Sequence, residues 1–277
     1  MEYQGDIGLY LSGCQVPIKM CGVYITPPKV REIVQFGETD FFSVCQMLAD
    51  VKKFVEPIKE GNSALAQRSD FQIFIGILVN EETSQVRRMF DSFMQLCFED
   101  FIIDITKKSI NFKVDEDGPN IGQINPFNLK EFSQTIRELF LPMKQEDEEI
   151  EYNIDENNQA AVRMLNKIME NRKKRAKAAQ EQAGNPTSIF AQYVSILSIG
   201  MGVSVNMFYD YTPFQLYDAF SRYIAKMSYD TYQSIITTPF VDSSKIEQVD
   251  NWVGDIYKPK PSVYNSMAEI GKLGGSA

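Results

Sequence analysis

The residues that decide the fold class run from Thr39 to Val55 and read Thr-Asp-Phe-Phe-Ser-Val-Cys-Gln-Met-Leu-Ala-Asp-Val-Lys-Lys-Phe-Val. Thr39 can cap the start of a helix, and Pro57 with Gly61-Asn62 predicts its end. Apolar side chains recur between these signals at spacings of three and four residues, the period of a helix with one buried face: Phe41, Phe42, Val44, Cys45, Leu48, Val51, Phe54 and Val55. This amphipathic stretch indicates a core built mainly from helices.

Helical signals continue on both sides of this stretch. Thr26-Pro27-Pro28 predicts a helix start, because Pro is tolerated in the first turn. Thr212-Pro213-Phe214-Gln215 is a capping box with Pro at the first helical position, and it predicts a helix that reaches about Thr237. Caps and spacings together predict further helices over about 27–37, 71–79, 82–98 and 128–141.

Two short β elements accompany the helices. Residues 7–11 and 16–20 look extended around the turn signal Ser12-Gly13, which predicts a small β element near the N-terminus. Residues 101–114 alternate around Lys107-Lys108-Ser109 and predict a β-hairpin, and residues 118–126 read as a loop. The expected fold class is therefore α+β, mainly α-helical, with a helical C-terminal domain.

A change in composition divides the chain. Residues 144–157 are crowded with Asp and Glu and contain few apolar residues, which is typical of a solvated linker. We therefore expect an N-terminal α+β domain at 1–143, an acidic linker at 144–157, a helical domain at 158–257 and a flexible tail at 258–277. The stretch Ala183–Tyr209 contains no charged residue. It reads as a buried helix plus a loop, with a membrane-spanning helix as the minor alternative.

The amino-acid counts argue against most enzyme chemistry. The chain has no His, which excludes Ser-His-Asp and Cys-His catalysis and His-containing zinc sites. Carboxylate chemistry and magnesium binding remain open on this count. Asp115-Glu116-Asp117 lacks the alternating oxygen ligands of a calcium loop, and no glycine-rich phosphate loop is present. We expect no catalytic residue, no metal and no cofactor.

The cysteines and the start of the chain bear on its location. None of the four cysteines forms a C-x-x-C pair, and Cys45 and Cys97 sit in apolar helical patterns where a small buried hydrophobe is expected. The first residues, Met1 to Asp6, show no signal-peptide pattern. These features favour a reducing cytoplasm.

Two groups of residues are candidates for partner binding. The first is the basic run Arg172, Lys173, Lys174 and Arg175 within residues 163–177, which reads as a solvated helix, a dock for an acidic protein or, as a minor alternative, a nucleic-acid site. The net charge of −9 opposes general attraction to nucleic acid. The second group is aromatic and Met-rich, and it reads as core or as a protein-binding groove: Phe208, Tyr209 and Tyr211, with Met201, Met207 and Met227.

Short blocks of the sequence resemble a known family. They are Pro27 to Ile33, Phe36 to Phe42, Ser69 to Phe74, the hairpin over 101–114, Phe214 to Arg222 and Val249 to Trp252. In their order, they resemble bacteriophage proteins encoded among virion-assembly genes and described as tail assembly chaperones or virion-associated proteins.

The resemblance implies a non-enzymatic role in building a phage tail. Such chaperones bind the long, aggregation-prone tape measure protein and help to recruit tail tube subunits. It implies these tail proteins as partners, the host cell cytoplasm as location, no membrane and no small-molecule substrate, and leaves oligomerisation open. The alternatives are a structural virion component of the neck or tail, and a nucleic-acid-binding regulatory protein that uses the basic helix 163–177.

Overall fold

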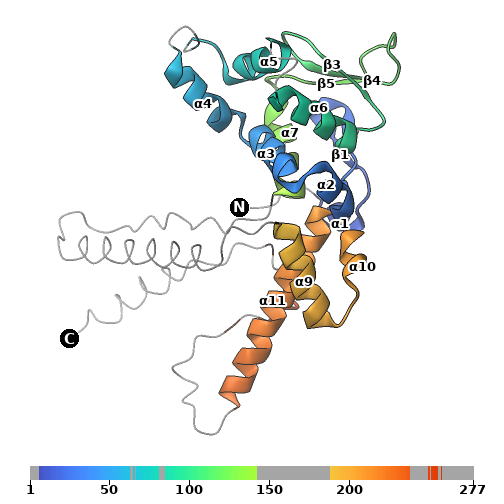
Figure 1. Ribbon diagram of the computed structural model, residues 1–277, viewed down its shortest axis with the longest axis vertical. Coiled ribbons are helices and arrows are strands. Elements are labelled where there is room, and N and C mark those ends of the chain that lie inside the picture. Colours follow the sequence, from blue (N-terminus) through green and yellow to red (C-terminus); the bar gives the residue numbers. More distant parts are fainter. Residues whose placement is uncertain are drawn as a thin grey trace, which may run out of the picture. The chain divides into compact units, whose positions relative to one another are not determined.

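The computed structural model describes residues 6–62, 65, 67–80, 85–141, 188–237, 249, 251–254 and 257. These residues form an α+β fold that is mainly helical, as predicted (Figure 1). The predicted linker at 144–157, the basic run Arg172 to Arg175 and the predicted tail at 258–277 lie outside the described residues.

The chain divides into two compact units. One unit comprises Leu9–Tyr217, and the other combines Met1–Gly8 with Asp218–Ala277. The first unit contains both β-sheets and all the described helices from α2 to α10. The predicted domain boundaries at residues 143 and 158 fall outside the described residues, so they stay predictions.

The N-terminal β element is confirmed, but it begins later than expected. Strands β1 (Val16–Ile18) and β2 (Val23–Ile25) pair antiparallel around the 3-10 turn η1 (Lys19–Cys21). The extended segment predicted at 7–11 is wrong, because Ile7–Ser12 forms the helix α1. A short apolar run does not distinguish strand from helix by its period. Tyr10 of this helix is buried, and its hydroxyl donates a hydrogen bond to Glu138 at 2.9 Å.

The stretch that predicted one long helix forms two. Helix α2 (Val30–Phe36) is followed by α3 (Glu38–Ala49) and α4 (Val51–Gly61). The break falls at Asp50, whose carboxylate accepts a hydrogen bond from the Lys53 amide and so caps α4. Pro57 lies inside α4 and does not end it, contrary to the prediction.

The remaining helices of the core follow their predicted segments. They are α5 (Asp70–Asn80), α6 (Gln85–Cys97) and α7 (Leu129–Phe140). The centre of the core is a cluster of buried rings. Phe41 of α3 lies 5.5 Å from Phe93 of α6 and 5.4 Å from Phe140 of α7, measured between ring centroids. Such pairs add to the burial of their apolar area.

The predicted hairpin is confirmed, and the structure adds a strand to it. Strands β3 (Ile102–Ile105) and β4 (Ile110–Lys113) pair antiparallel, and β5 (Gly122–Ile124) pairs with β4 in the segment predicted as a loop. Gly122 allows β5 to lie close to the η1 turn, because a Cβ at this position would overlap the Cys21 carbonyl oxygen. The absent side chain lets β5 pass against the η1 turn, as only Gly permits such an approach.

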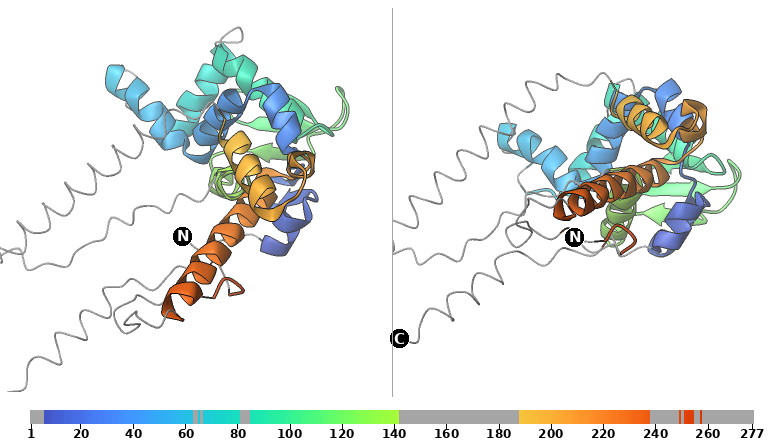
Figure 2. Two further views of the ribbon diagram at one scale, coloured as in Figure 1. Left: turned by 60° about the horizontal axis from the view of Figure 1, so that its bottom comes forward. Right: turned by 90° about the horizontal axis from the view of Figure 1, so that it is seen from below.

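Helices α9 (Ile189–Met201) and α10 (Val205–Tyr209) follow, and α11 (Pro213–Ile236) begins at the predicted capping box. Thr212 and Gln215 form this box: the Thr212 amide donates to the Gln215 side chain at 2.8 Å, and the Gln215 amide donates to the Thr212 hydroxyl. Helices α9 and α10, in yellow and light orange, lie side by side in both views of Figure 2, and α10 contacts α2. The Val30 amide of α2 donates to the Tyr211 carbonyl oxygen, which fixes this arrangement.

A carboxylate from α3 holds the first turn of α9. Glu38 accepts hydrogen bonds from the backbone amides of Ile189 and Phe190 and from the Ser188 hydroxyl. These amides have no partner within the helix, and a negative charge is favourable at this end of the helix dipole. The Ser188 hydroxyl in turn caps the Ala191 amide at 2.9 Å.

Glu38→Ala should lower the free energy of unfolding by about 2 kcal/mol, because it removes a charged acceptor from several donors at once. Urea unfolding followed by circular dichroism measures this change. Glu56→Ala, at an exposed position of α4, is the matched control and should have little effect. Equal stabilities of the two variants would show that Glu38 does not anchor α9.

The cysteines should differ sharply in reactivity. Cys14 is exposed, whereas burial raises the pKa of Cys21 to about 12 and the pKa values of Cys45 and Cys97 well above their ordinary value. Because the thiolate is the reactive form, a disulfide reagent should modify only Cys14 rapidly in the folded protein. Absorbance of the released thiolate measures this reaction. Cys14→Ser should abolish the rapid phase, and a rapid phase that survives in this variant would contradict the assignment.

Candidate functional site: an uncharged apolar face on α9 and α10

Helix α9 has two different faces. Phe190, Val194 and Leu197 are spaced by four and three residues, and all three are buried. Phe190 packs against Phe42 of α3, with the ring centroids 5.3 Å apart. This inner face attaches α9 to the core, so the prediction of a buried helix holds for one side of α9.

The outer side of α9 and the neighbouring α10 expose apolar side chains to solvent. We call this surface the α9–α10 face, and its members are Ile196, Ile199, Met201, Val205 and Met207. Ile199 is 82% exposed and Met201 is 53% exposed. These side chains come from two helices that contact one another, and exposed apolar patches commonly mark interaction sites.

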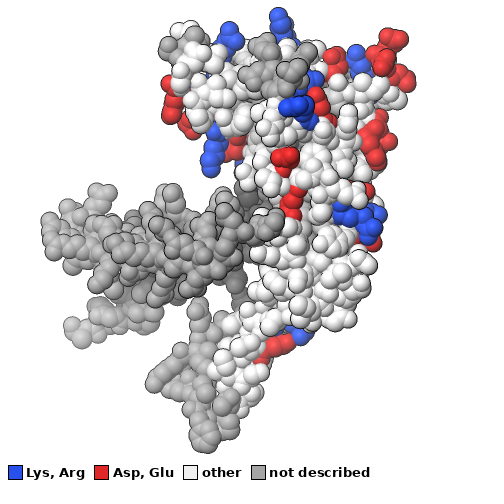
Figure 3. Space-filling view, in the orientation of Figure 1, with Lys and Arg blue, Asp and Glu red and all other residues white. Residues whose placement is uncertain are grey.

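Neither α9 nor α10 nor the turn between them contributes a charged side chain to this surface. Between Ser188 and Tyr209 the sequence contains no Lys, Arg, Asp or Glu. The space-filling view accordingly shows a broad area without charged residues over α9 and α10 (Figure 3). Charges appear at its border, where Arg31 of α2 pairs with Asp210 at 2.8 Å just after α10. An apolar centre with a polar rim is the usual anatomy of a protein-binding surface.

The turn between α9 and α10 is tightly defined. Gly202 adopts a positive φ of 67° and ends α9, as glycine commonly does at helix C-termini. The Ser198 hydroxyl donates to the Val203 carbonyl oxygen at 2.6 Å, and the Val203 amide donates to the Ser198 carbonyl oxygen. These bonds set the angle between α9 and α10. The exposed side chains of the two helices therefore have a defined position relative to one another.

Aromatic packing supports the face from beneath. The Phe190 ring stacks on Tyr217 of α11 with centroids 6.2 Å apart, and Tyr193 meets Tyr217 edge to face. The Tyr217 hydroxyl donates to the Phe140 carbonyl oxygen at 3.3 Å. Burial raises the pKa of Tyr217 well above its ordinary value and also raises the pKa of Tyr193. Both rings therefore stay neutral and act as structural supports.

The predicted partner-binding aromatics are placed unequally. Phe208 is only 1% exposed and packs edge to face against Tyr211, so its ring belongs to the core. Tyr209 and Tyr211 are half-buried at the edge of α10. Met201 and Met207, named with them as a potential groove, are both exposed on the α9–α10 face. The basic residues Arg172, Lys173, Lys174 and Arg175 lie outside the described residues.

The isoleucines of the face were not singled out from the sequence. The signal for them was composition, because the stretch from Ser188 to Tyr209 is rich in apolar residues and carries no charge. Such a helix is expected to be fully buried or in a membrane. None of the described helices is both long and apolar enough to cross a membrane.

The third methionine, Met227, lies on α11 in the other unit. There Ile224, Met227, Tyr232 and Ile235 line a hollow of about 490 Å³ together with Ser228, Thr231 and Val249. Within the described part of the chain, no group of three or more His, Cys, Asp or Glu side chains is arranged to hold a metal ion. The expectation of a protein without metal, cofactor or catalysis stays a prediction.

Comparison with known proteins shows a similarity over part of the chain. Residues 181–257, less than a third of the chain, match a family model described as the YomV second domain. No curated protein and no solved structure matches the chain. The matched stretch contains α9, α10 and α11 and therefore the whole α9–α10 face. This part of the chain is similar to a domain of a phage-like protein family.

Proposed function

We propose that this chain is a non-enzymatic phage tail assembly chaperone that binds an apolar helical segment of a tail protein on the α9–α10 face. The observation that carries the proposal is the exposed, charge-free face inside the stretch that is similar to a phage-like domain. The expected clients are the tape measure protein and the tail tube subunits. They are the partners implied by the resemblance of the short sequence blocks to tail assembly chaperones.

The chemistry of the face suits such a client. An amphipathic helix is recognised by apolar side chains that receive its residues at helical spacing. Met201 and Met207 provide adaptable thioether side chains, which tolerate clients of varied shape. Ile199 is the most exposed residue of the face and can insert between client side chains. The absence of charge means that burial of the face does not require the desolvation of an ion.

Binding without chemistry also fits the residue content. The chain has no His, and burial raises the pKa values of three of its four cysteines, which disfavours their reactive thiolates. An assembly chaperone needs neither group. It acts by covering the apolar surface of the client until the client assembles.

Ile199→Asp should weaken capture of the tape measure protein about tenfold or more, because a carboxylate at the centre of an apolar contact must be desolvated. Co-expression followed by affinity capture, with the soluble client quantified on a gel, measures the effect. The variant should keep its stability, since Ile199 is 82% exposed.

Val114→Asp is the matched control, because Val114 is an exposed apolar residue outside the face. It should capture the client as the wild-type protein does. Equal capture by the Ile199 variant and the wild type would refute the assigned surface. A tape measure protein that stays insoluble and unbound with wild-type chain present would refute the chaperone role.

The runner-up is a structural component of the virion neck or tail, which could use the same face for a permanent contact. Mass spectrometry of purified virions separates the two roles. A chaperone should be absent from the particle, whereas a structural component should be present in stoichiometric amount. The second result would show that the chain is a structural component of the virion and would refute the chaperone role.

A further inference from the structure

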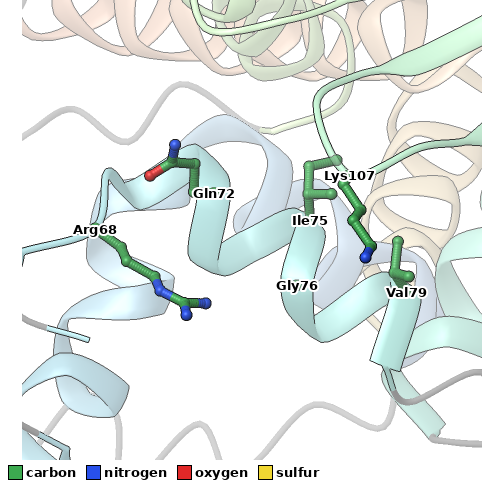
Figure 4. Close-up of a pocket in the computed structure, with 6 residues that line it drawn as sticks. All are labelled: Arg68, Gln72, Ile75, Gly76, Val79 and Lys107. Carbon is green, nitrogen blue, oxygen red and sulfur yellow. The ribbon is translucent and has the colours of Figure 1, made fainter. Parts of the chain in front are cut away.

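A second surface feature has chemistry opposite to that of the α9–α10 face. It is a cleft of about 430 Å³ lined by Arg68, Gln72, Ile75, Gly76, Val79 and Lys107. Its floor is one side of α5, from Gln72 to Val79. Arg68 reaches it from the segment before α5, and Lys107 reaches it from the β3–β4 turn (Figure 4). The volume lies within the range of ligand-binding clefts.

Both cations of the cleft lack an ionic partner within the described part of the chain. Neither side chain takes part in a salt bridge or side-chain hydrogen bond there. The carboxylates closest in sequence are already engaged: Asp70 pairs with Lys59, and Asp104 pairs with Lys113. None of the lining residues that the structure describes is acidic. In a chain of net charge −9, two cations that share a cleft and have no carboxylate partner among the described residues make a local positive site.

The glycine in the floor supplies a second, independent observation. Gly76 lies inside α5, where glycine is less favourable than alanine by about 1 kcal/mol. Its φ is not positive, and no atom lies within 4 Å of the place where a Cβ would stand. Neither backbone conformation nor packing therefore requires glycine here. What the missing side chain does provide is depth at the centre of the cleft.

We infer that this cleft binds an acidic peptide segment of a partner protein. Arg68 and Lys107 lie toward opposite ends of the cleft, with Gly76 between them (Figure 4). The floor from Gln72 to Val79 spans about 10 Å of helix axis, more than a single phosphate or carboxylate group can bridge. An extended chain with acidic side chains can reach both cations and lay an apolar residue over Gly76 and Val79.

This inference goes beyond the proposed chaperone function and does not depend on it. The cleft is built from α5 and the β3–β4 turn, and it lies outside the residues that match the phage-like domain. It also differs in chemistry from the α9–α10 face, because it selects charge. The two surfaces can therefore be tested separately.

The test measures binding of a fluorescein-labelled synthetic peptide rich in Glu and Leu to the full chain by fluorescence anisotropy. The double variant Arg68→Gln with Lys107→Gln should weaken binding about tenfold or more, because two charge-assisted contacts are lost. Lys52→Gln with Lys53→Gln removes the same charge from exposed positions of α4 and is the matched control. It should change the dissociation constant by less than about twofold.

A third variant tests the shape of the cleft without a change of charge. Gly76→Leu places a side chain into open space and raises helix propensity, so it should fold with an unchanged or higher melting temperature. It should nevertheless weaken peptide binding about tenfold, because the side chain fills the floor. Unchanged binding by this variant would overturn the assigned cleft.

Further outcomes separate the alternatives. No measurable binding by the wild-type chain would overturn the inference. Equal losses in the two charge variants would also overturn it, because they would show that the peptide is attracted nonspecifically. The same peptide with Gln in place of Glu should not bind, and comparable affinity for it would refute recognition of charge. Displacement of the acidic peptide by an equal concentration of inorganic phosphate would show a small-anion site and refute the peptide assignment.

Discussion

The bond between the Glu38 carboxylate and the first turn of α9 is the constraint on which the candidate surface depends. It joins residues that are about 150 positions apart in the chain, and it satisfies donors that a helix cannot satisfy by itself. Because the start of α9 is held in this way and Phe190 packs on Phe42, the rotation of the helix about its axis is fixed. That rotation decides which side chains are buried and which form the α9–α10 face. A polar contact thus determines the placement of an apolar surface.

The two candidate surfaces would recognise a partner by different kinds of interaction. The α9–α10 face is apolar and uncharged, whereas the cleft on α5 presents Arg68 and Lys107. An apolar face gains free energy from burial with little directional preference, and a charged cleft contributes selectivity and faster encounter. A protein with both kinds of surface can gain affinity for a partner at the apolar face and selectivity for it at the charged cleft.

Local signals were sufficient for much of the fold. The box formed by Thr212 and Gln215, the hairpin over 101–114 and the apolar helix after Ser69 are all present, because each depends on residues close in sequence. Features set by distant partners were missed. In α1, Tyr10 contacts Glu138 of α7, which is 128 positions away, and in β5, Gly122 passes close to the η1 turn. The α9–α10 face was missed for the same reason: the aromatic and Met content pointed to the region, but only the packed structure shows that Phe208 lies inside while Ile199 lies outside.

The close passage of Gly122 over the η1 turn has a consequence for the alignment of the strands. If β5 slipped by one residue along β4, Ile121 or Gln123 would take the place of the glycine against Cys21 and Gly22. Neither side chain fits where even a methyl group would overlap a backbone atom. The alternative alignments are therefore eliminated by steric exclusion, whatever hydrogen bonds they could form. One missing side chain selects a single register for the edge strand and, through it, the relative position of two small sheets that share no strand.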